Sequence, residues 1–169
     1  MRSGLSVRRP AAPRAQPDRI SFVPEVRPAL AKDMPTLRAL LEGADLPISD
    51  LATARPQFLV ALEGNRIVAG GALQRFGTSA LLRSVVVVPE LRGGGLGRLI
   101  VRELERAALA DGVSQLVLLT ETAKSFFAQQ RYQVIDRKDV PPEMQQSEEF
   151  RTLCPASATC MAKVLSPRA

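Results

Sequence analysis

The feature that most constrains the fold is an apolar strand followed by a glycine-rich loop and an amphipathic helix. Residues 81–88 are mostly apolar and end in four consecutive valines, which is typical of a strand buried on both faces. Glycine occupies four of the five positions 93–97, and the helix that follows has one apolar face and ends near Leu109. Residues 116–119 are a second apolar run, so the segment predicts a right-handed β-α-β unit.

The other segments predict further strands and short helices around this unit. Two apolar runs, 58–62 and 66–73, are separated by Glu63-Gly64-Asn65, which indicates a β-hairpin. We expect strands also at 25–27, 132–135 and 159–164, and helices at 33–41, 50–54, 123–129 and 141–151. This order predicts an α+β or α/β fold with a mixed sheet.

The composition excludes several kinds of chemistry. The 169 residues contain no histidine, which excludes Ser-His-Asp hydrolysis and histidine acid–base catalysis. The two cysteines, Cys154 and Cys160, are too few for a four-ligand zinc site and do not indicate a secreted disulfide scaffold. We therefore expect no metal and a cytoplasmic location. No apolar run approaches the roughly 20 residues of a membrane span, so no membrane partner is expected.

The net charge of +6 is concentrated at the N-terminus. Residues 1–20 contain five arginines and one aspartate, whereas the rest of the chain is nearly neutral and poor in aromatic residues. Such a tail attracts polyanions non-specifically but does not indicate a specific nucleic-acid partner. Its prolines argue against an amphipathic transit helix. We expect a disordered Arg/Pro-rich leader at 1–22 and a single folded domain at 23–169.

The loop after the valine-rich strand has the properties of a pyrophosphate-binding site. Gly93, Gly94 and Gly95 allow backbone N–H groups to turn toward an anion, and the helix N-terminus adds unpaired donors. Arg92 and Arg98 add full charges on either side. A P-loop would need Gly-Lys-Ser/Thr at its end, and a Rossmann motif would need a third glycine at position 98. The remaining alternative is a glycine turn that binds nothing.

Arg92-Gly93-Gly94-Gly95-Leu96-Gly97 resembles the Arg/Gln-x-x-Gly-x-Gly motif with which GNAT N-acetyltransferases bind acetyl-coenzyme A. The resemblance extends over about residues 25–165. It implies a GNAT-like α+β fold, in which a mixed, mostly antiparallel sheet has splayed central strands and helices on both faces. It also implies acetyl-coenzyme A as co-substrate. We expect direct acetyl transfer, because residues 85–97 contain no cysteine and no histidine is present to activate a serine.

The resemblance also implies which residues hold this co-substrate. The backbone of the valine-rich strand would pair with the pantetheine arm, and the loop would hold the pyrophosphate. The cofactor-binding residues expected on this basis are Val85, Val86, Val87, Arg92, Gly93, Gly94, Gly95, Leu96, Gly97 and Arg98.

The catalytic groups are less defined, because the chain departs from the family pattern. Phe127 stands where many family members have a tyrosine that acts as general acid, and we expect the nearby Tyr132 to be a core residue. No carboxylate lies on the strand before the loop. Glu121 is the candidate general base, and an exposed acidic residue at a helix N-terminus is the alternative. Arg83 and Ser84 are candidate substrate-binding residues, although Arg83 could equally need an acidic structural partner.

A narrower resemblance concerns the C-terminal third of the chain. Residues 118–123 and 149–158 resemble segments of acetyltransferases encoded in arsenic-resistance operons. This implies a role in arsenic detoxification, with an arsenical or its amine-bearing derivative as one candidate substrate. We expect a small-molecule amine as acceptor. Whether Cys154 and Cys160 bind trivalent arsenic or pack as small apolar residues stays open, as does a homodimer. The alternative functions are a non-catalytic GNAT-like module that binds coenzyme A or an arsenical, and a protein N-acetyltransferase.

Overall fold

The computed structural model describes residues 22–167. The expected leader at 1–22 therefore lies outside the described residues, except for its last position. The strands are β1 (Glu25–Pro28), β2 (Gln57–Glu63), β3 (Arg66–Phe76), β4 (Ser79–Val87), β5 (Gln115–Thr120), β6 (Gln133–Val134) and β7 (Thr159–Val164). The α-helices are α1 (Met34–Gly43), α2 (Leu51–Ala54), α3 (Leu96–Ala110), α4 (Lys124–Gln129) and α5 (Pro142–Gln145).

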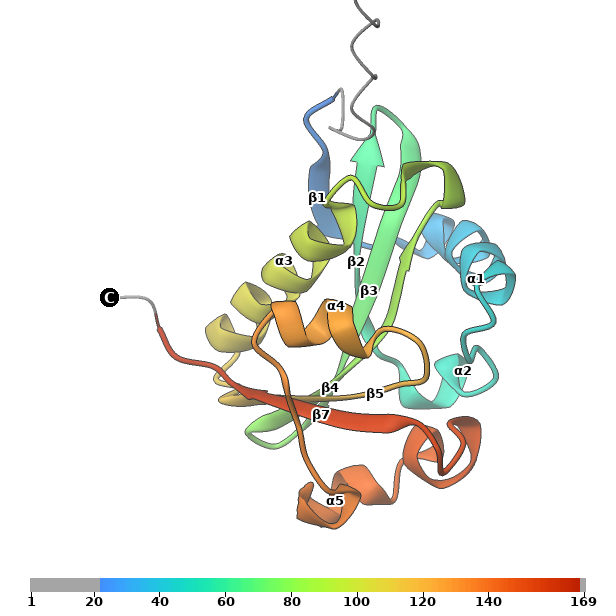
Figure 1. The fold of residues 1–169 in the computed structure, drawn as a ribbon. Coiled ribbons are helices and arrows are strands. Elements are labelled where there is room, and N and C mark those ends of the chain that lie inside the picture. Colours follow the sequence, from blue (N-terminus) through green and yellow to red (C-terminus); the bar gives the residue numbers. More distant parts are fainter. Residues whose placement is uncertain (1–21, 168–169) are drawn as a thin grey trace, which may run out of the picture.

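The seven strands form one open sheet in the order β1-β2-β3-β4-β5-β7-β6 (Figure 1). Every neighbouring pair is antiparallel except β4 and β5, which are parallel and connected through α3. This confirms both the β-α-β unit and the α+β fold with a mixed, mostly antiparallel sheet.

The parallel strands β4 and β5 separate shortly after they begin. Their pairing runs only from Ser79 opposite Gln115 to Leu81 opposite Val117. On its other side, β4 stays paired with β3 but has a register shift just after Arg83, and Ser84 in this bulge has a φ of 60°. A bulge bends its strand and increases the local twist. The central strands are therefore splayed, as the family resemblance implied.

Two consecutive glycines in β3 allow helices to approach both faces of the sheet. A Cβ atom at Gly70 would lie 2.7 Å from Leu37 of α1. A Cβ atom at Gly71 would lie 2.8 Å from both Ile100 and Leu104 of α3. Successive residues of a strand point to opposite faces. The helices α1 and α3 therefore cover opposite sides of the sheet (Figure 1).

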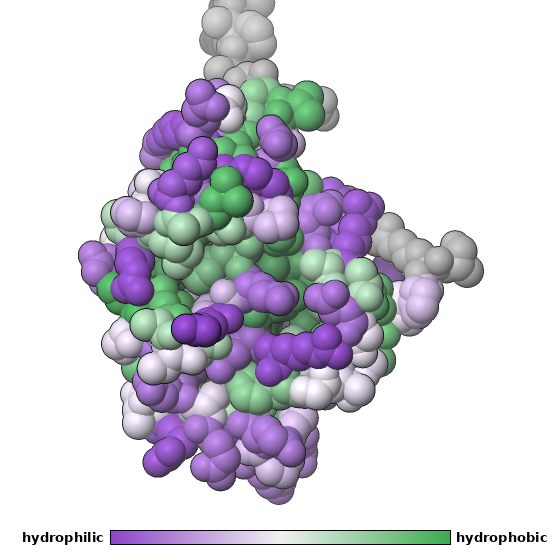
Figure 2. Space-filling model, turned by 180° about the vertical axis from the view of Figure 1, so that it is seen from behind, coloured by the Kyte–Doolittle hydropathy of each residue, from purple (hydrophilic) through white to green (hydrophobic). Residues whose placement is uncertain are grey.

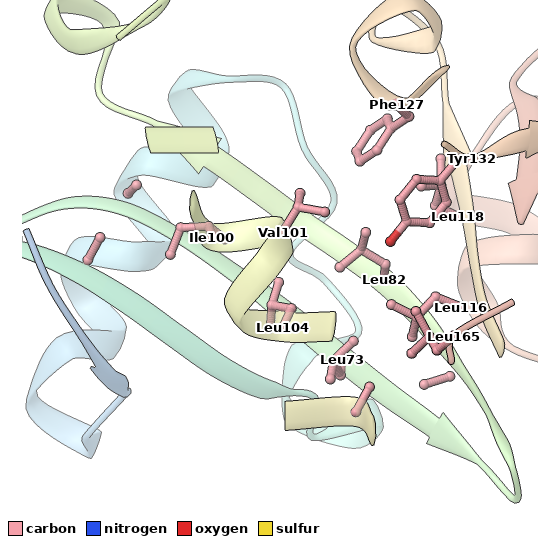
Figure 3. Close-up of a cluster of buried hydrophobic side chains, with 14 of the residues drawn as sticks. Leu73, Leu82, Ile100, Val101, Leu104, Leu116, Leu118, Phe127, Tyr132 and Leu165 are labelled. Atoms are coloured by element: carbon pink, nitrogen blue, oxygen red, sulfur yellow. The ribbon is translucent and has the colours of Figure 1, made fainter. Parts of the chain in front are cut away.

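The main core lies between α3 and the sheet. Figure 3 shows Ile100, Val101 and Leu104 of α3 beside Leu73 and Leu82 of the strands. Burial of each such side chain contributes about 1.5–3 kcal/mol. On the opposite face, one apolar cluster lies under α1 and another under α5. Viewed from behind, the surface is hydrophilic around a recessed apolar area (Figure 2).

Two segments differ from the sequence prediction. The helix expected at 141–151 is divided into α5 and a π-helical turn, Glu149–Leu153. Between them, the hydroxyl of Ser147 donates a 2.7 Å hydrogen bond to the carbonyl of Met144, a local bond of the kind that competes with helix continuation. The strand expected at 132–135 is reduced to β6, because the backbone N–H of Tyr132 donates a 3.1 Å hydrogen bond to the carbonyl of Phe127 in α4 instead of to a neighbouring strand. Within residues 22–167 no helix is long and apolar enough to cross a membrane.

Candidate active site

A cleft of about 990 Å³ lies where β4 and β5 separate. Its walls come from five parts of the chain that are far apart in sequence. They are the end of β4, the glycine loop, the segment from the end of β5 into α4, the loop between α1 and α2, and the segment between α5 and β7. The divergence of two neighbouring strands thus creates a site at the centre of the sheet.

The glycine loop ends at the N-terminus of α3, beside this cleft. Gly93 and Gly95 have φ values of 84° and 96°, which glycine adopts without a steric penalty. No side chain in the described part of the chain caps the first turn of α3, so its backbone N–H groups are available to an anion. A Cβ atom at Gly95 would meet no atom within 4 Å. This side of the loop therefore faces open space.

Most of the expected cofactor-binding residues lie around the cleft. The residues that line it are Val85, Val86, Val87, Arg92, Gly93, Gly95, Gly97 and Arg98. Gly94 is not among the lining residues, and the side chain of Leu96 is buried in the core, so Leu96 offers a ligand only its backbone. The binding role of this set stays a prediction.

Within residues 22–167, no strand pairs with the edge of β4 that faces the cleft. After Leu81, β4 continues to pair with β3 through Val87, but it no longer pairs with β5. An extended molecule can add to such an edge through main-chain hydrogen bonds. The side chain of Arg92 is directed at this strand, where its Nε donates a 3.3 Å hydrogen bond to the carbonyl of Val87.

Arg83, the charged residue on this otherwise apolar strand, has an acidic partner inside the protein. Its Nη1 and Nη2 atoms each lie 2.6 Å from an oxygen of Asp50, and the two side chains are 1% and 2% exposed. Gln74 accepts a further hydrogen bond at 3.0 Å. Burial is the largest single influence and lowers the pKa of Arg83, but the bond to Asp50 and the charges of Glu149 and Asp50 together outweigh it and raise that pKa. A substrate-binding role for Arg83 and for Ser84 stays a prediction.

Like Asp45, Glu149 on the π-helical turn is an acidic residue of the cleft that the sequence did not single out. Its Oε2 lies 3.3 Å from Nε of Arg83, and among the described residues neither buried atom has a hydrogen-bond partner. Its Oε1 accepts a 3.7 Å hydrogen bond from the thiol of Cys154. Burial raises the pKa of Glu149 to about 7, although the charge of Arg83 opposes this. The sequence clue to Glu149 was Arg83, because a charged residue on an otherwise apolar strand needs an acidic partner. This clue does not say which acidic residue is the partner.

Glu121, the candidate base from the sequence, also lines the cleft. It follows the end of β5 and is exposed to solvent. Next to it, the hydroxyl of Thr120 accepts a 2.9 Å hydrogen bond from the backbone of Ala123 and holds the turn before α4. The position of Glu121 fits both alternatives left open by the sequence, so its catalytic role stays a prediction.

Phe127 and Tyr132 both lie in the main core, where their rings pack edge to face with centroids 5.6 Å apart (Figure 3). Phe127 also lines the cleft, whereas Tyr132, with 3% exposure, is not among the lining residues. The hydroxyl of Tyr132 donates a 3.0 Å hydrogen bond to Glu105, which also pairs with Lys163 at 2.8 Å. Burial raises the pKa of Tyr132, so its hydroxyl stays protonated. This confirms the expected core position of Tyr132.

The two cysteines have different surroundings. Cys160 on β7 is buried in the apolar cluster under α5, while the half-buried Cys154 lines the cleft. Burial raises the pKa of Cys154 to about 12 and that of Cys160 to about 11. Both thiols are therefore protonated at neutral pH. Within the described part of the chain, no group of three or more His, Cys, Asp or Glu residues has the arrangement of a metal site.

This combination of splayed strands and glycine loop agrees with comparisons to known proteins. Residues 54–134 match the family model described as an acetyltransferase (GNAT) domain. Rv2747 from Mycobacterium tuberculosis, solved in complex with CoA, is 25% identical, with a TM-score of 0.71 over 84% of this chain and 99% of that chain. The chain thus resembles GNAT acetyltransferases in sequence over residues 54–134 and shares their fold.

Two more distant structures share the fold. N-acetylglutamate synthase from Neisseria gonorrhoeae, complexed with coenzyme A and L-arginine, is 19% identical with a TM-score of 0.73. The match covers 85% of this chain but 34% of that one, so the chain spans about a third of that enzyme. The ribosomal-protein-S18-alanine N-acetyltransferase from Escherichia coli is 16% identical with a TM-score of 0.65, over 87% and 97% of the two chains. No protein of curated function matches the chain.

Proposed function

We propose that the protein transfers an acetyl group directly from acetyl-coenzyme A to a small-molecule amine. The observation that carries this proposal is the cleft between β4 and β5, in which a free strand edge leads to an uncapped helix N-terminus. Acetyl-coenzyme A has the complementary chemistry, since its pantetheine arm contains amides and its other end a pyrophosphate.

Within this proposal the backbone of Val85, Val86 and Val87 pairs with the pantetheine amides. The first N–H groups of α3 and of the glycine loop bind the pyrophosphate, with Arg92 and Arg98 adding charge. The thioester then lies near the bulge of β4, between the loop at 43–47 and the segment at 149–154. These two segments supply the remaining walls of the cleft and would hold the acceptor.

The burial and the protonation of the two cysteines favour direct transfer over a mechanism with an acyl-enzyme intermediate. Cys160 is buried away from the cleft, and the thiol of Cys154 is protonated at neutral pH because burial raises its pKa to about 12. A protonated thiol is a poor nucleophile. Acetyl-coenzyme A and the amine would therefore be bound together, and the enzyme gains its rate from positioning them.

The arsenic-resistance resemblance adds an arsenical amine to the acceptors to be tried. Cys154 lines the cleft, whereas Cys160 is buried in the apolar cluster under α5 and is not among the residues that line the cleft. A trivalent arsenical held jointly by both is thus not part of the proposal. The cytoplasmic location expected from the sequence stays a prediction.

The test combines binding and turnover. Calorimetry should show that acetyl-coenzyme A binds, and release of free thiol should then be followed with a panel of primary alkylamines, diamines, α-amino acids and an arsenical amine. Turnover with at least one amine supports the proposal. Binding without turnover would support a non-catalytic module, which the phenylalanine at position 127 favours. Turnover only with peptides that expose an N-terminal amine would instead support a protein N-acetyltransferase.

A further inference from the structure

We propose that Glu149 is the general base that removes a proton from the acceptor amine. This inference rests on the proposed function and names a residue for it. Glu149 lines the cleft, and its carboxylate lies 3.3 Å from Nε of Arg83. Arg83 directly precedes the bulge residue Ser84 and stands two positions before Val85, where the proposed thioester site begins.

Glu149 is the second of two carboxylates that lie beside the single positive charge of Arg83. Asp50 binds both Nη atoms at 2.6 Å, and Gln74 accepts a third bond, so the charge of Arg83 already has one carboxylate partner besides Glu149, which lies beside its Nε. A second buried carboxylate beside a single arginine is costly if it serves structure alone. Its Oε2 is buried and has no hydrogen-bond partner among the described residues. That oxygen therefore has lone pairs that no hydrogen bond occupies.

The surroundings of Glu149 suit a base that works near neutral pH. The groups that face it are Arg83 on β4, Asp50 before α2, and Cys154 at the end of its own turn. Cys154 is in turn influenced by the charges of Arg137 and Glu121. Burial raises the pKa of Glu149 to about 7, Arg83 lowers it, Asp50 raises it, and the bond from Cys154 lowers it. A general base is most effective when its pKa lies near the working pH.

The proton and electron balance is complete without another reactant. The acceptor arrives as an ammonium ion, and the carboxylate of Glu149 takes one proton to leave a neutral amine. The nitrogen lone pair forms the new C–N bond at the thioester carbonyl, and the C–S bond breaks with its electron pair on sulfur. The second nitrogen proton passes to the thiolate, directly or through water, and Glu149 returns its proton to solvent.

The test compares Glu149→Gln with Glu148→Gln, which removes the same charge from the exposed neighbouring residue. Thiol release with acetyl-coenzyme A is measured across pH 5.5–9 with two amines that the wild type acetylates, chosen for different pKa values. We expect Glu149→Gln to lower kcat/KM by about 100-fold or more, while calorimetric binding of acetyl-coenzyme A is retained. For the wild type and for Glu148→Gln, a plot of kcat/KM against pH should rise with a midpoint near pH 7. This midpoint should be the same with both amines. In Glu149→Gln the rise should be absent.

A third variant keeps the test decisive if Glu149→Gln unfolds. Cys154→Ala removes the hydrogen bond that lowers the Glu149 pKa, so the midpoint of the rise should move to higher pH. Full activity with an unchanged rise in Glu149→Gln, or an unmoved midpoint in Cys154→Ala, would overturn the assignment. A wild type that neither binds acetyl-coenzyme A nor releases thiol would instead overturn the proposed function, and this inference with it.

Discussion

Arg83 and Asp50 form a two-point ion pair beneath the cleft, with both Nη–Oδ distances at 2.6 Å and both side chains almost fully buried. A buried pair of this kind is costly to break, because the partner left behind keeps an uncompensated charge. The pair therefore fixes the position of α2 against β4, and with it one wall of the cleft.

We predict that Asp50→Asn lowers the free energy of unfolding by about 3 kcal/mol or more. The matched control is Glu90→Gln, because Glu90 pairs with Arg66 at the surface, where both side chains are about half exposed. An exposed pair contributes less than about 1 kcal/mol. Urea denaturation of the two variants measures the difference. Equal, small losses in both would contradict the structural role of the buried pair.

The glycine loop gives a prediction about binding. Gly95→Val adds a side chain on the open side of the loop and should weaken binding of coenzyme A at least tenfold, which corresponds to about 1.4 kcal/mol. Gly64→Val is the control, since Gly64 has a comparable positive φ in the turn between β2 and β3. It carries the same kind of backbone strain far from the cleft. Calorimetry should show weaker binding only in the Gly95 variant.

Tyr132 gives a prediction about the general acid. Tyr132→Phe removes the hydrogen bond to Glu105 and should cost about 1 kcal/mol of stability. The rate of acetyl transfer should not change, because the hydroxyl lies in the core and is already bound. Thermal unfolding and steady-state kinetics measure the two effects. A rate loss of about 100-fold at unchanged stability would identify Tyr132 as an acid after all.

Replacing the two cysteines should change the stability of the protein by different amounts, whereas neither thiol should react with acetyl-coenzyme A. Cys160→Ser places a hydroxyl in an apolar cluster and should destabilise the protein by about 1–3 kcal/mol, whereas Cys154→Ser at the cleft should cost less. Neither thiol should become acetylated when the protein is incubated with acetyl-coenzyme A alone. Intact-protein mass spectrometry checks this. Acetylated Cys154 together with ping-pong kinetics would refute direct transfer.

Glu149 should make stability depend on pH. Its pKa in the folded protein is about 7, above the ordinary value of 4.5, so the folded state holds a proton that the unfolded state releases. The free energy of unfolding should therefore fall as pH rises between these two values. Denaturation of Glu149→Gln, compared with the wild type, should lack this decline. A wild type whose stability rises over the same range relative to the variant would show that Glu149 is stabilised as a carboxylate.

Local patterns in the sequence were sufficient for most elements of the fold. The valine-rich strand, the helix after the glycine loop and the strand at 159–164 appear as predicted, because each has a strong period and clear ends. The helix expected at 141–151 is interrupted at Ser147, whose hydroxyl bonds to the backbone instead of continuing the helical pattern. The bulge at Ser84 was not predicted, because a register shift depends on the partner strand.

The part of the site made of backbone groups could be predicted from the sequence, but the cluster of charged side chains could not. The glycine loop is contiguous in sequence, so its residues could be named from the motif. The cluster of Asp50, Arg83 and Glu149 brings together residues 33 and 66 positions apart, and only the packing of α2 and the π-helical turn against β4 unites them. The sequence indicated that Arg83 needs an acidic partner. It did not indicate which acidic residues the fold places beside it.

The bulge that separates β4 from β5 also divides the cleft into two parts that can change independently. One part offers main-chain groups of the β4 edge and the glycine loop, which most substitutions leave in place. The other part consists of side chains from the loop at 43–47 and the turn at 149–154, neither of which belongs to the sheet. Under the proposed function, mutations in these two segments would change which acceptor binds while the part that binds acetyl-coenzyme A is preserved. New acceptors would then be accessible by single substitutions, without an intermediate that has lost its co-substrate.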